Sequence, residues 1–146
     1  MSKVKVKVEH MPAFQEYVIS RQTLNQKLTL LNLEALYLWD NFFWYISLED
    51  WGKVLKDVLF GMLKYTVDKF DCDNYSLLTS AKVGERYQLN SCGIVIGSTP
   101  GGEHAWNIFL AKVDNEAKLF YCEPQDGMIF PIEEDASYKA KIIILG

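Results

Sequence analysis

The spacing of apolar residues changes near residue 90, and this change limits the folds open to the chain. Before it, apolar residues recur at steps of three and four, the period of a helix that buries one face. After it, short apolar or alternating runs are separated by turn residues, a pattern typical of strands. Helices followed by strands predict an α+β domain in which N-terminal helices pack on a C-terminal antiparallel β-sheet.

Three helices are predicted before the change. The first covers about residues 14–46, where apolar and aromatic side chains keep a helical but impure period. Ser47 resembles the first residue of a capping box and opens the clearest helix of the chain. The third helix starts at Asp71 or Cys72 and runs to about Arg86, with Asp71 suited to accept hydrogen bonds from amides of the first turn.

Five strands are predicted after the change, at about residues 94–97, 104–113, 118–123, 128–132 and 141–145. The loop at 114–115 is interpreted as a two-residue hairpin turn, which fixes the register of the strands on either side. That register places His104 and Glu123 on one face of the sheet as diagonal neighbours, and Asn107 on the other face. A shift of one residue in the turn would reverse this arrangement.

Chain length and charge exclude several classes of protein. At 146 residues the chain suits one domain, in which we expect residues 47–146 to form the core and residues 1–46 an N-terminal extension. The net charge is -4, and basic residues cluster only at Lys3, Lys5 and Lys7. A nucleic-acid partner is therefore not expected, because phosphate-backbone binding needs a broad basic surface.

The cysteines and the lengths of the apolar runs indicate the cellular compartment of the protein. The three cysteines show no C-x-x-C spacing, which argues against a disulfide framework and favours a reducing compartment. Cys92 and Cys122 are interpreted as core residues. The N-terminus lacks the apolar segment of a signal peptide, and no apolar run reaches the roughly 18 residues of a membrane span. We therefore expect a cytoplasmic protein without a membrane partner.

A cysteine, a histidine and two polar residues follow one another in an order that suits thiol chemistry. Cys72 begins a predicted helix, whose unpaired amides favour the thiolate, the form that attacks a carbonyl. His104 is placed downstream to act as the base, and either Glu123 or Gln125 to orient its ring. These four side chains are the candidate catalytic residues.

Metal binding is an alternative role for some of the same side chains. Asp71 and Asp73 flank Cys72 and offer the oxygen ligands that Ca²⁺ prefers. Cys72 and His104 offer the softer ligands that suit Zn²⁺. The spacing matches no known metal-binding loop, so the sequence does not require a cofactor. Of the two metals, calcium at Asp71 and Asp73 is favoured over zinc.

Four short motifs resemble a known family. They are FDCDNY at 70–75, GIVIG at 93–97, HAWN at 104–107 and EPQ at 123–125. They resemble a group of phage and bacterial proteins similar to the papain-like C-terminal domain of a fungal agglutinin, in which a Cys-His-Glu triad gives calcium-dependent thiol peptidase activity. The resemblance covers about residues 65–132. By position it implies that Cys72 is the nucleophile, His104 the base and Glu123 the third member.

Two functions follow from this resemblance. The first is a papain-like cysteine hydrolase, a peptidase or amidase of phage or bacterial origin that acts on a peptide or amide substrate. The alternative is a phage virion or assembly protein that keeps the papain-like fold without the chemistry. In that case the aromatic-rich segment 39–51, otherwise a core helix, would join copies of the chain or other phage proteins. The protein would then lie in the host cytoplasm or the virion.

Overall fold

The computed structural model describes residues 3–4 and 14–146. Its helices and strands are, in order, β1 (Tyr17–Ser20), α1 (Arg21–Leu28), η1 (Thr29–Leu31), β2 (Ala35–Leu38), β3 (Phe42–Ser47), α2 (Leu48–Leu59), α3 (Cys72–Tyr87), β4 (Cys92–Thr99), β5 (Gly102–Val113), β6 (Glu116–Glu123), β7 (Met128–Pro131) and β8 (Lys139–Leu145). Strands make up more of the described chain than helices do.

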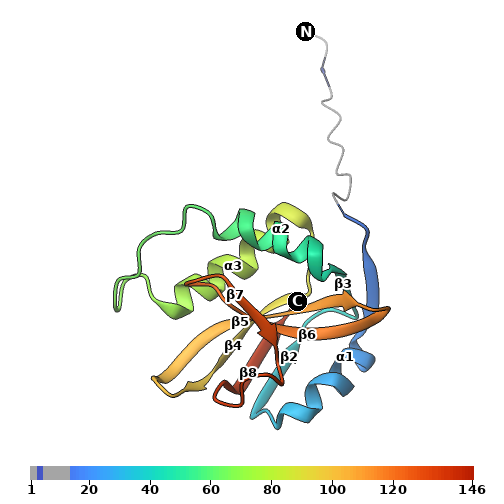
Figure 1. The fold of residues 1–146 in the computed structure, drawn as a ribbon. Coiled ribbons are helices and arrows are strands. Elements are labelled where there is room, and N and C mark those ends of the chain that lie inside the picture. Colours follow the sequence, from blue (N-terminus) through green and yellow to red (C-terminus); the bar gives the residue numbers. More distant parts are fainter. Residues whose placement is uncertain (1–2, 5–13) are drawn as a thin grey trace.

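The eight strands form one sheet that curls into a half-barrel (Figure 1). The main path of the sheet runs β1-β3-β5-β4-β8-β2, and β6 and β7 extend it from β5. β2 lies parallel to β8, and β3 lies parallel to β5. The remaining pairs are antiparallel. The sheet is therefore mixed, and it takes strands from both ends of the chain.

The predicted fold class, N-terminal helices on a C-terminal antiparallel sheet, is wrong. The segment expected to be helical, at about residues 14–46, instead supplies three strands of the sheet, with one short α-helix and a 3-10 turn between the first two. In β3 the side chains alternate: Phe42 and Trp44 are exposed, whereas Phe43 and Tyr45 are buried. The crowded aromatics also fit steps of three and four, so the sequence did not reveal this two-residue period. Pairing with neighbouring strands decides between the two periods.

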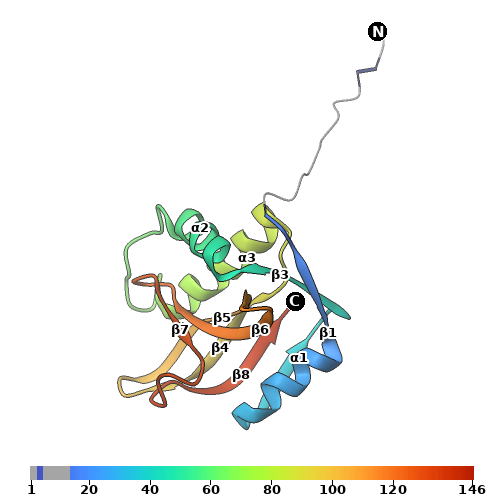
Figure 2. The same cartoon turned by 45° about the vertical axis from the view of Figure 1, so that its right-hand side comes forward.

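Each face of the sheet carries an apolar core. On one face, Leu24 of α1 lies in the same core cluster as Trp106 of β5. On the other face, Trp51 of α2 and Val83 of α3 share a cluster with Phe109 of β5. The views in Figures 1 and 2 show α2 and α3 together on one side of the sheet and α1 on the other. Side chains that alternate along β5 therefore enter two different cores.

The predicted starts of α2 and α3 are confirmed. Ser47 caps α2, since its Oγ accepts a hydrogen bond from the Asp50 amide at 3.1 Å. Helix α3 begins at Cys72, with Asp71 as its N-cap in a capping box with Asn74. Neither these nor any other helix of the described residues is long and apolar enough to cross a membrane.

The predicted hairpin between β5 and β6 is also confirmed. Val113 pairs with Glu116 across the two turn residues. Those residues, Asp114 and Asn115, have φ angles of 49° and 64°. Both lie in the left-handed region, as a type I′ turn requires. The register on which the candidate site depends is therefore the expected one.

Candidate functional site

His104 and Glu123 meet on one face of the sheet. His104 lies near the start of β5, and Glu123 is the last residue of β6. His104 Nε2 lies 2.6 Å from Glu123 Oε2, and the two side chains are 18% and 10% exposed. A hydrogen bond this short between partly buried groups fixes the orientation of the imidazole ring. When Glu123 is ionised, Nε2–H donates to it, which leaves Nδ1 as the proton acceptor of the ring.

Aromatic side chains enclose this pair. The Trp106 ring stacks on His104 at 5.8 Å between centroids. Tyr138 meets Trp106 edge-on at 5.2 Å, and its hydroxyl donates to Glu123 Oε2 at 3.4 Å. Burial, and next the charge of Glu123, raise the pKa of Tyr138. Two buried polar atoms, Glu123 Oε1 and Trp106 Nε1, have no hydrogen-bond partner in the described structure.

Gln125, the other candidate to orient the ring, lies apart from this pair. It is exposed in the turn that follows β6. Its side chain makes no hydrogen bond within the part of the chain that the structure describes. The structure therefore brings Glu123, and not Gln125, to the imidazole.

Asn107 faces the opposite side, as the hairpin register predicted. Its Nδ2 donates to the carbonyls of Ser76 and Gly93, both at 2.9 Å. The Asn107 side chain is fully buried, and its two hydrogen bonds link α3 to β4 inside the protein. Asn107 therefore holds the helix whose first residue is Cys72.

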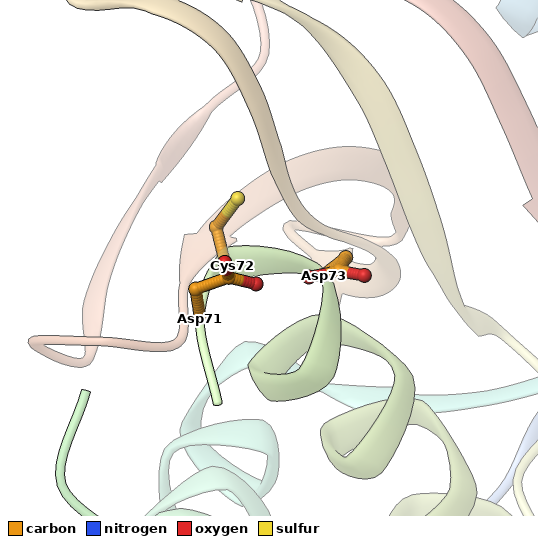
Figure 3. Close-up of side chains that lie close together, drawn as sticks. All are labelled: Asp71, Cys72 and Asp73. Atoms are coloured by element: carbon orange, nitrogen blue, oxygen red, sulfur yellow. The ribbon is translucent and has the colours of Figure 1, made fainter. Parts of the chain in front are cut away.

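Cys72 is a half-buried, free thiol at the head of α3. Figure 3 shows its side chain pointing away from the helix, beside Asp71 and Asp73. No hydrogen bond joins the thiol to His104 within the described residues. The predicted site residues thus fall into two groups, a histidine–glutamate pair on the sheet and a cysteine between two acids on the helix.

The two acids act on each other. A shared hydrogen bond lowers the pKa of Asp71 and raises that of Asp73. A single proton held between neighbouring carboxyl groups has this effect. Carboxyl oxygens of both acids therefore lie beside the Cys72 thiol at the start of α3.

The donor set around Cys72 is small for a metal. One ligand atom from each of Asp71, Cys72 and Asp73 lies within 4.8 Å of the others. Ca²⁺ takes six to eight oxygen ligands, of which two carboxylates supply only a part. The predicted zinc ligand His104 directs Nε2 at Glu123 instead. This cluster alone does not define a metal site.

The other two cysteines are core residues, as interpreted from the sequence. Cys92 is 3% exposed and Cys122 is fully buried. Burial raises the pKa of the Cys92 thiol, and it raises that of Cys122 to about 12. Both thiols therefore stay protonated and unreactive in the folded protein.

The model of one known protein family matches nearly the whole described chain. Residues 13–145 match the model of the family described as ricin-type beta-trefoil lectin C-terminal domain. The chain belongs to this family. No curated protein matches the chain.

Two solved structures resemble this lectin C-terminal domain. One is described as a PSL1a-E64 complex, with 20% identity, a TM-score of 0.71 and coverage of 87% of this chain and 51% of that chain. The other is Polyporus squamosus lectin bound to the human-type influenza-binding epitope Neu5Aca2-6Galb1-4GlcNAc, with 21% identity, a TM-score of 0.71 and coverage of 87% and 49%. The chain spans about half the length of both.

The family match overturns the papain-like assignment. The four motifs that suggested it are short and lie within residues 65–132, whereas the lectin family model spans 13–145 and includes the N-terminal strands. The predicted recognition, the papain-like fold and the peptidase or amidase function are therefore wrong. The alternative of a phage virion or assembly protein is overturned as well, because the family is one of lectins.

The predicted partners are corrected on the same ground. Neither a peptide or amide substrate nor a phage protein fits a lectin family. Segment 39–51 is also not one continuous surface, because Phe43, Tyr45 and Trp51 are buried. Its exposed aromatics are Trp39, Phe42 and Trp44.

Proposed function

We propose that this chain takes part in carbohydrate recognition, as a domain of the lectin family to which it belongs. The observation that carries the proposal is the family match over residues 13–145. The glycan named for Polyporus squamosus lectin supports it. Because the chain spans about half of that structure, glycan binding by this chain alone is the point to be tested.

The exposed aromatics of segment 39–51 are the surface on which we place a glycan. Trp39, Phe42 and Trp44 are 66%, 58% and 44% exposed. Pyranose rings carry C–H groups on one face, and these pack well against a flat aromatic ring. Large aromatics contribute apolar area with little loss of side-chain freedom, so they suit a ligand that is otherwise polar. We call these three residues the aromatic surface.

Asn90 holds the backbone of the aromatic surface in place. Its Nδ2 donates to Asp40 Oδ2 at 2.8 Å and to the Phe42 carbonyl at 2.9 Å. Its Oδ1 accepts from the Trp44 amide at 2.7 Å. A surface fixed before the ligand arrives loses less entropy on binding, which favours affinity.

Binding of the chain to immobilised glycans tests this proposal. The probes are the trisaccharide named for the lectin neighbour and the neutral disaccharide that remains when its terminal acidic sugar is removed. We expect both to bind, and we expect Trp44→Ala and Trp39→Ala each to weaken binding about tenfold, the loss of one stacking contact. Phe60→Ala is the matched control, since Phe60 is 84% exposed at the end of α2. Absence of binding, or an equal loss in the control, would contradict the proposal.

A second proposal concerns the candidate site residues. We propose that Cys72 is a reactive thiol, His104 its proton acceptor and Glu123 the group that orients the ring. The 2.6 Å bond from His104 to Glu123 supports these roles, because it leaves Nδ1 to accept the proton. Gln125 is exposed in a turn, and we assign it no role at this site.

Thiol alkylation tests the second proposal. Intact-mass measurement after treatment with iodoacetamide should show one adduct per folded chain, and Cys72→Ser should show none. His104→Asn should slow alkylation about tenfold or more at neutral pH if the imidazole takes the thiol proton. An exposed asparagine, Asn25→Ala, is the control. An unchanged rate in His104→Asn would remove the histidine from this role.

A further inference from the structure

The connection between α2 and α3 projects from the body of the fold. In Figures 1 and 2 it swings outward, away from both helices and from the sheet. We call its residues 60–70 the apolar loop. Three of its side chains are largely exposed: Phe60 at 84%, Leu63 at 68% and Val67 at 66%. We call these three the apolar tips. Large apolar side chains gathered on one exposed segment mark a contact surface, whereas single ones do not.

Hydrogen bonds hold the backbone of the apolar loop. The Thr66 amide donates to the Phe70 carbonyl at 2.7 Å, and the Phe70 amide donates back to the Thr66 carbonyl at 2.8 Å. This closed turn contains Val67. Nearer to α2, the Tyr75 hydroxyl of α3 donates to the Leu63 carbonyl. A loop fixed in this way loses little entropy when its side chains meet another surface.

The apolar loop divides its apolar residues between the protein and the solvent. Phe70 is half-buried, and its ring packs on Tyr75 at 4.8 Å between centroids. The apolar tips, in contrast, belong to neither of the two core clusters formed by the described residues. Their exposure is therefore not a by-product of packing against the sheet.

Two lysines alternate with the apolar tips. Lys64 follows Leu63, and Lys69 lies two residues after Val67, with Asp68 the one acid of the apolar loop. Neither lysine forms an ion pair with a carboxylate of residues 14–146. A lysine side chain can lie along an apolar surface while its ammonium group reaches a phosphate. The apolar loop therefore combines apolar area with two unpaired cations.

The size and shape of the apolar tips favour a lipid surface over a second protein chain. Three side chains of this size expose on the order of 400 Å² together. A stable protein interface buries about 800 Å² on each partner. Because the tips project, a protein partner would also need a matching hollow. A bilayer needs none, since its lipids move aside.

We propose that the apolar loop inserts its tips into the surface of a lipid bilayer, with Lys64 and Lys69 at the headgroup phosphates. Tyr65, which is 42% exposed between the two lysines, suits the boundary, because its ring is apolar and its hydroxyl is polar. The contact is peripheral, since only a few side chains enter the bilayer. The expectation of no membrane partner concerned spanning segments, whereas this contact requires none. The inference goes beyond carbohydrate recognition and does not depend on it.

Sedimentation with sucrose-loaded vesicles of pure phosphatidylcholine tests this inference, since these vesicles carry no sugar. We expect the protein to bind them, and we expect Phe60→Ser and Leu63→Ser each to weaken binding about tenfold, the loss of one partly inserted side chain. Leu30→Ser is the matched control, because Leu30 is 85% exposed but lies in η1. Binding should persist in about 0.5 M salt, because insertion of apolar groups is not screened.

A fluorescent label reports insertion directly. Val67→Cys in a Cys72→Ser background offers one exposed thiol, since Cys92 and Cys122 are buried. An environment-sensitive dye such as NBD at position 67 should brighten and shift to shorter wavelength when vesicles are added. The same dye at Leu30→Cys should not change. Circular dichroism confirms that each variant is folded.

Several outcomes would overturn the inference. They are absence of vesicle binding, an equal loss in Leu30→Ser, or release of the protein by salt. A dimer that forms without lipid and is abolished by Leu63→Ser, in a protein that ignores vesicles, would assign the tips to a second copy instead.

Trp44→Ala separates this inference from the proposed glycan surface. This variant should bind phosphatidylcholine vesicles as the natural protein does. If it loses vesicle binding, the aromatic surface and not the apolar loop meets the lipid, and the inference fails. If glycan binding fails while the vesicle results hold, the inference stands on its own.

Discussion

Asn107 is a single buried side chain that joins a helix to two strands. It lies on β5, and its amide donates to carbonyls of α3 and β4. The other face of the same strand carries His104, three residues earlier. Alternate side chains of the segment from 104 to 107 therefore point to opposite faces of the sheet.

Replacement of Asn107 by alanine should destabilise the protein. Two hydrogen bonds are lost and two carbonyls lose a partner inside the protein, so we expect a decrease of about 2–4 kcal/mol in the free energy of unfolding. Urea denaturation followed by tryptophan fluorescence measures the change. The exposed Asn25→Ala should change stability by less than about 0.5 kcal/mol. A similar small effect at Asn107 would show that its amide does not hold α3.

Single residues differ in how far the sequence predicts them. The contact between His104 and Glu123 follows from the two-residue period of strands once the turn at 114–115 is identified. Tyr138, which donates to Glu123, comes from the segment between β7 and β8. Nothing local marks such a residue, because its position depends on how distant strands pair. The choice of Glu123 over Gln125 also needed the three-dimensional arrangement.

Helices α2 and α3 are linked through one exposed carboxylate. Asp57 Oδ2 accepts from the Tyr87 hydroxyl at 2.8 Å and from Arg86 Nη1 at 3.1 Å. The hydrogen bond from Tyr87, and next that from Arg86, lower the pKa of Asp57 below the usual range of an aspartate. A carboxyl group of lowered pKa contributes stability that is present above its unfolded pKa and lost as pH falls through its folded pKa.

This link predicts a difference in acid sensitivity. Between about pH 5 and pH 2 the natural protein should lose more stability than Asp57→Asn, which cannot ionise. Thermal unfolding over that range, followed by circular dichroism, measures the two slopes. The change Glu49→Gln removes an exposed acid near the start of the same helix and should leave the slope as it is. Identical slopes for all three proteins would exclude the link as a source of acid sensitivity.

Gly97 marks where three elements approach one another. A Cβ atom at this position would collide with the Lys139 carbonyl and lie 2.8 Å from the Trp106 ring. The strand pairing also shifts between Ile96 and Gly97. The glycine that ends the GIVIG motif is therefore explained by close packing of β4, β5 and β8.

Gly97→Ala should destabilise the protein by about 1–3 kcal/mol, because backbone atoms cannot move aside cheaply. Gly84→Ala offers the opposite case within α3, where no atom lies within 4 Å of the added Cβ. There we expect a gain of about 0.5–1 kcal/mol from helix propensity. The midpoints of urea denaturation distinguish the two. Equal effects of the two substitutions would mean that the β4–β8 approach is not tight.

Helices and strands were predicted best where a capping or turn residue marks the start of the element and its apolar residues fit a single period. Helices α2 and α3 have capping residues, and the β5–β6 hairpin has two residues able to adopt positive φ. In segment 14–46, Ser20 caps the short helix α1, but no comparable signal marks the strands, whose aromatic residues fit more than one period. Its strands depend on β5 and β8, which are distant in sequence. That dependence explains why the fold class was predicted wrongly.

For the molecule as a whole, the three cysteines provide a simple measure of the native state. Cys72 is half-buried, whereas Cys92 and Cys122 are buried and have raised pKa values. A thiol reagent such as DTNB should react with one thiol in the folded protein and with three after unfolding in urea. Cys72→Ser should show none before unfolding. Rapid reaction of a second thiol in the native protein would contradict the buried positions.

The cytoplasmic location and the single domain with an extension at 1–46 stay predictions. Calcium at Asp71 and Asp73 likewise stays a prediction. The family, by contrast, was not accessible from short motifs, since a few residues at each of four places resemble more than one family. The family match along residues 13–145 also depends on the strands outside these four motifs.

The parallel pairing of β2 with β8 has a consequence for synthesis of the protein. β2 is made early, yet the strand beside it is the last one in the sheet. While the polypeptide is still emerging from the ribosome, Tyr37 and its neighbours remain unpaired, because β8 has not yet been made. Completion of the sheet is therefore a late event, and partially made chains expose an unpaired apolar edge that chaperones recognise.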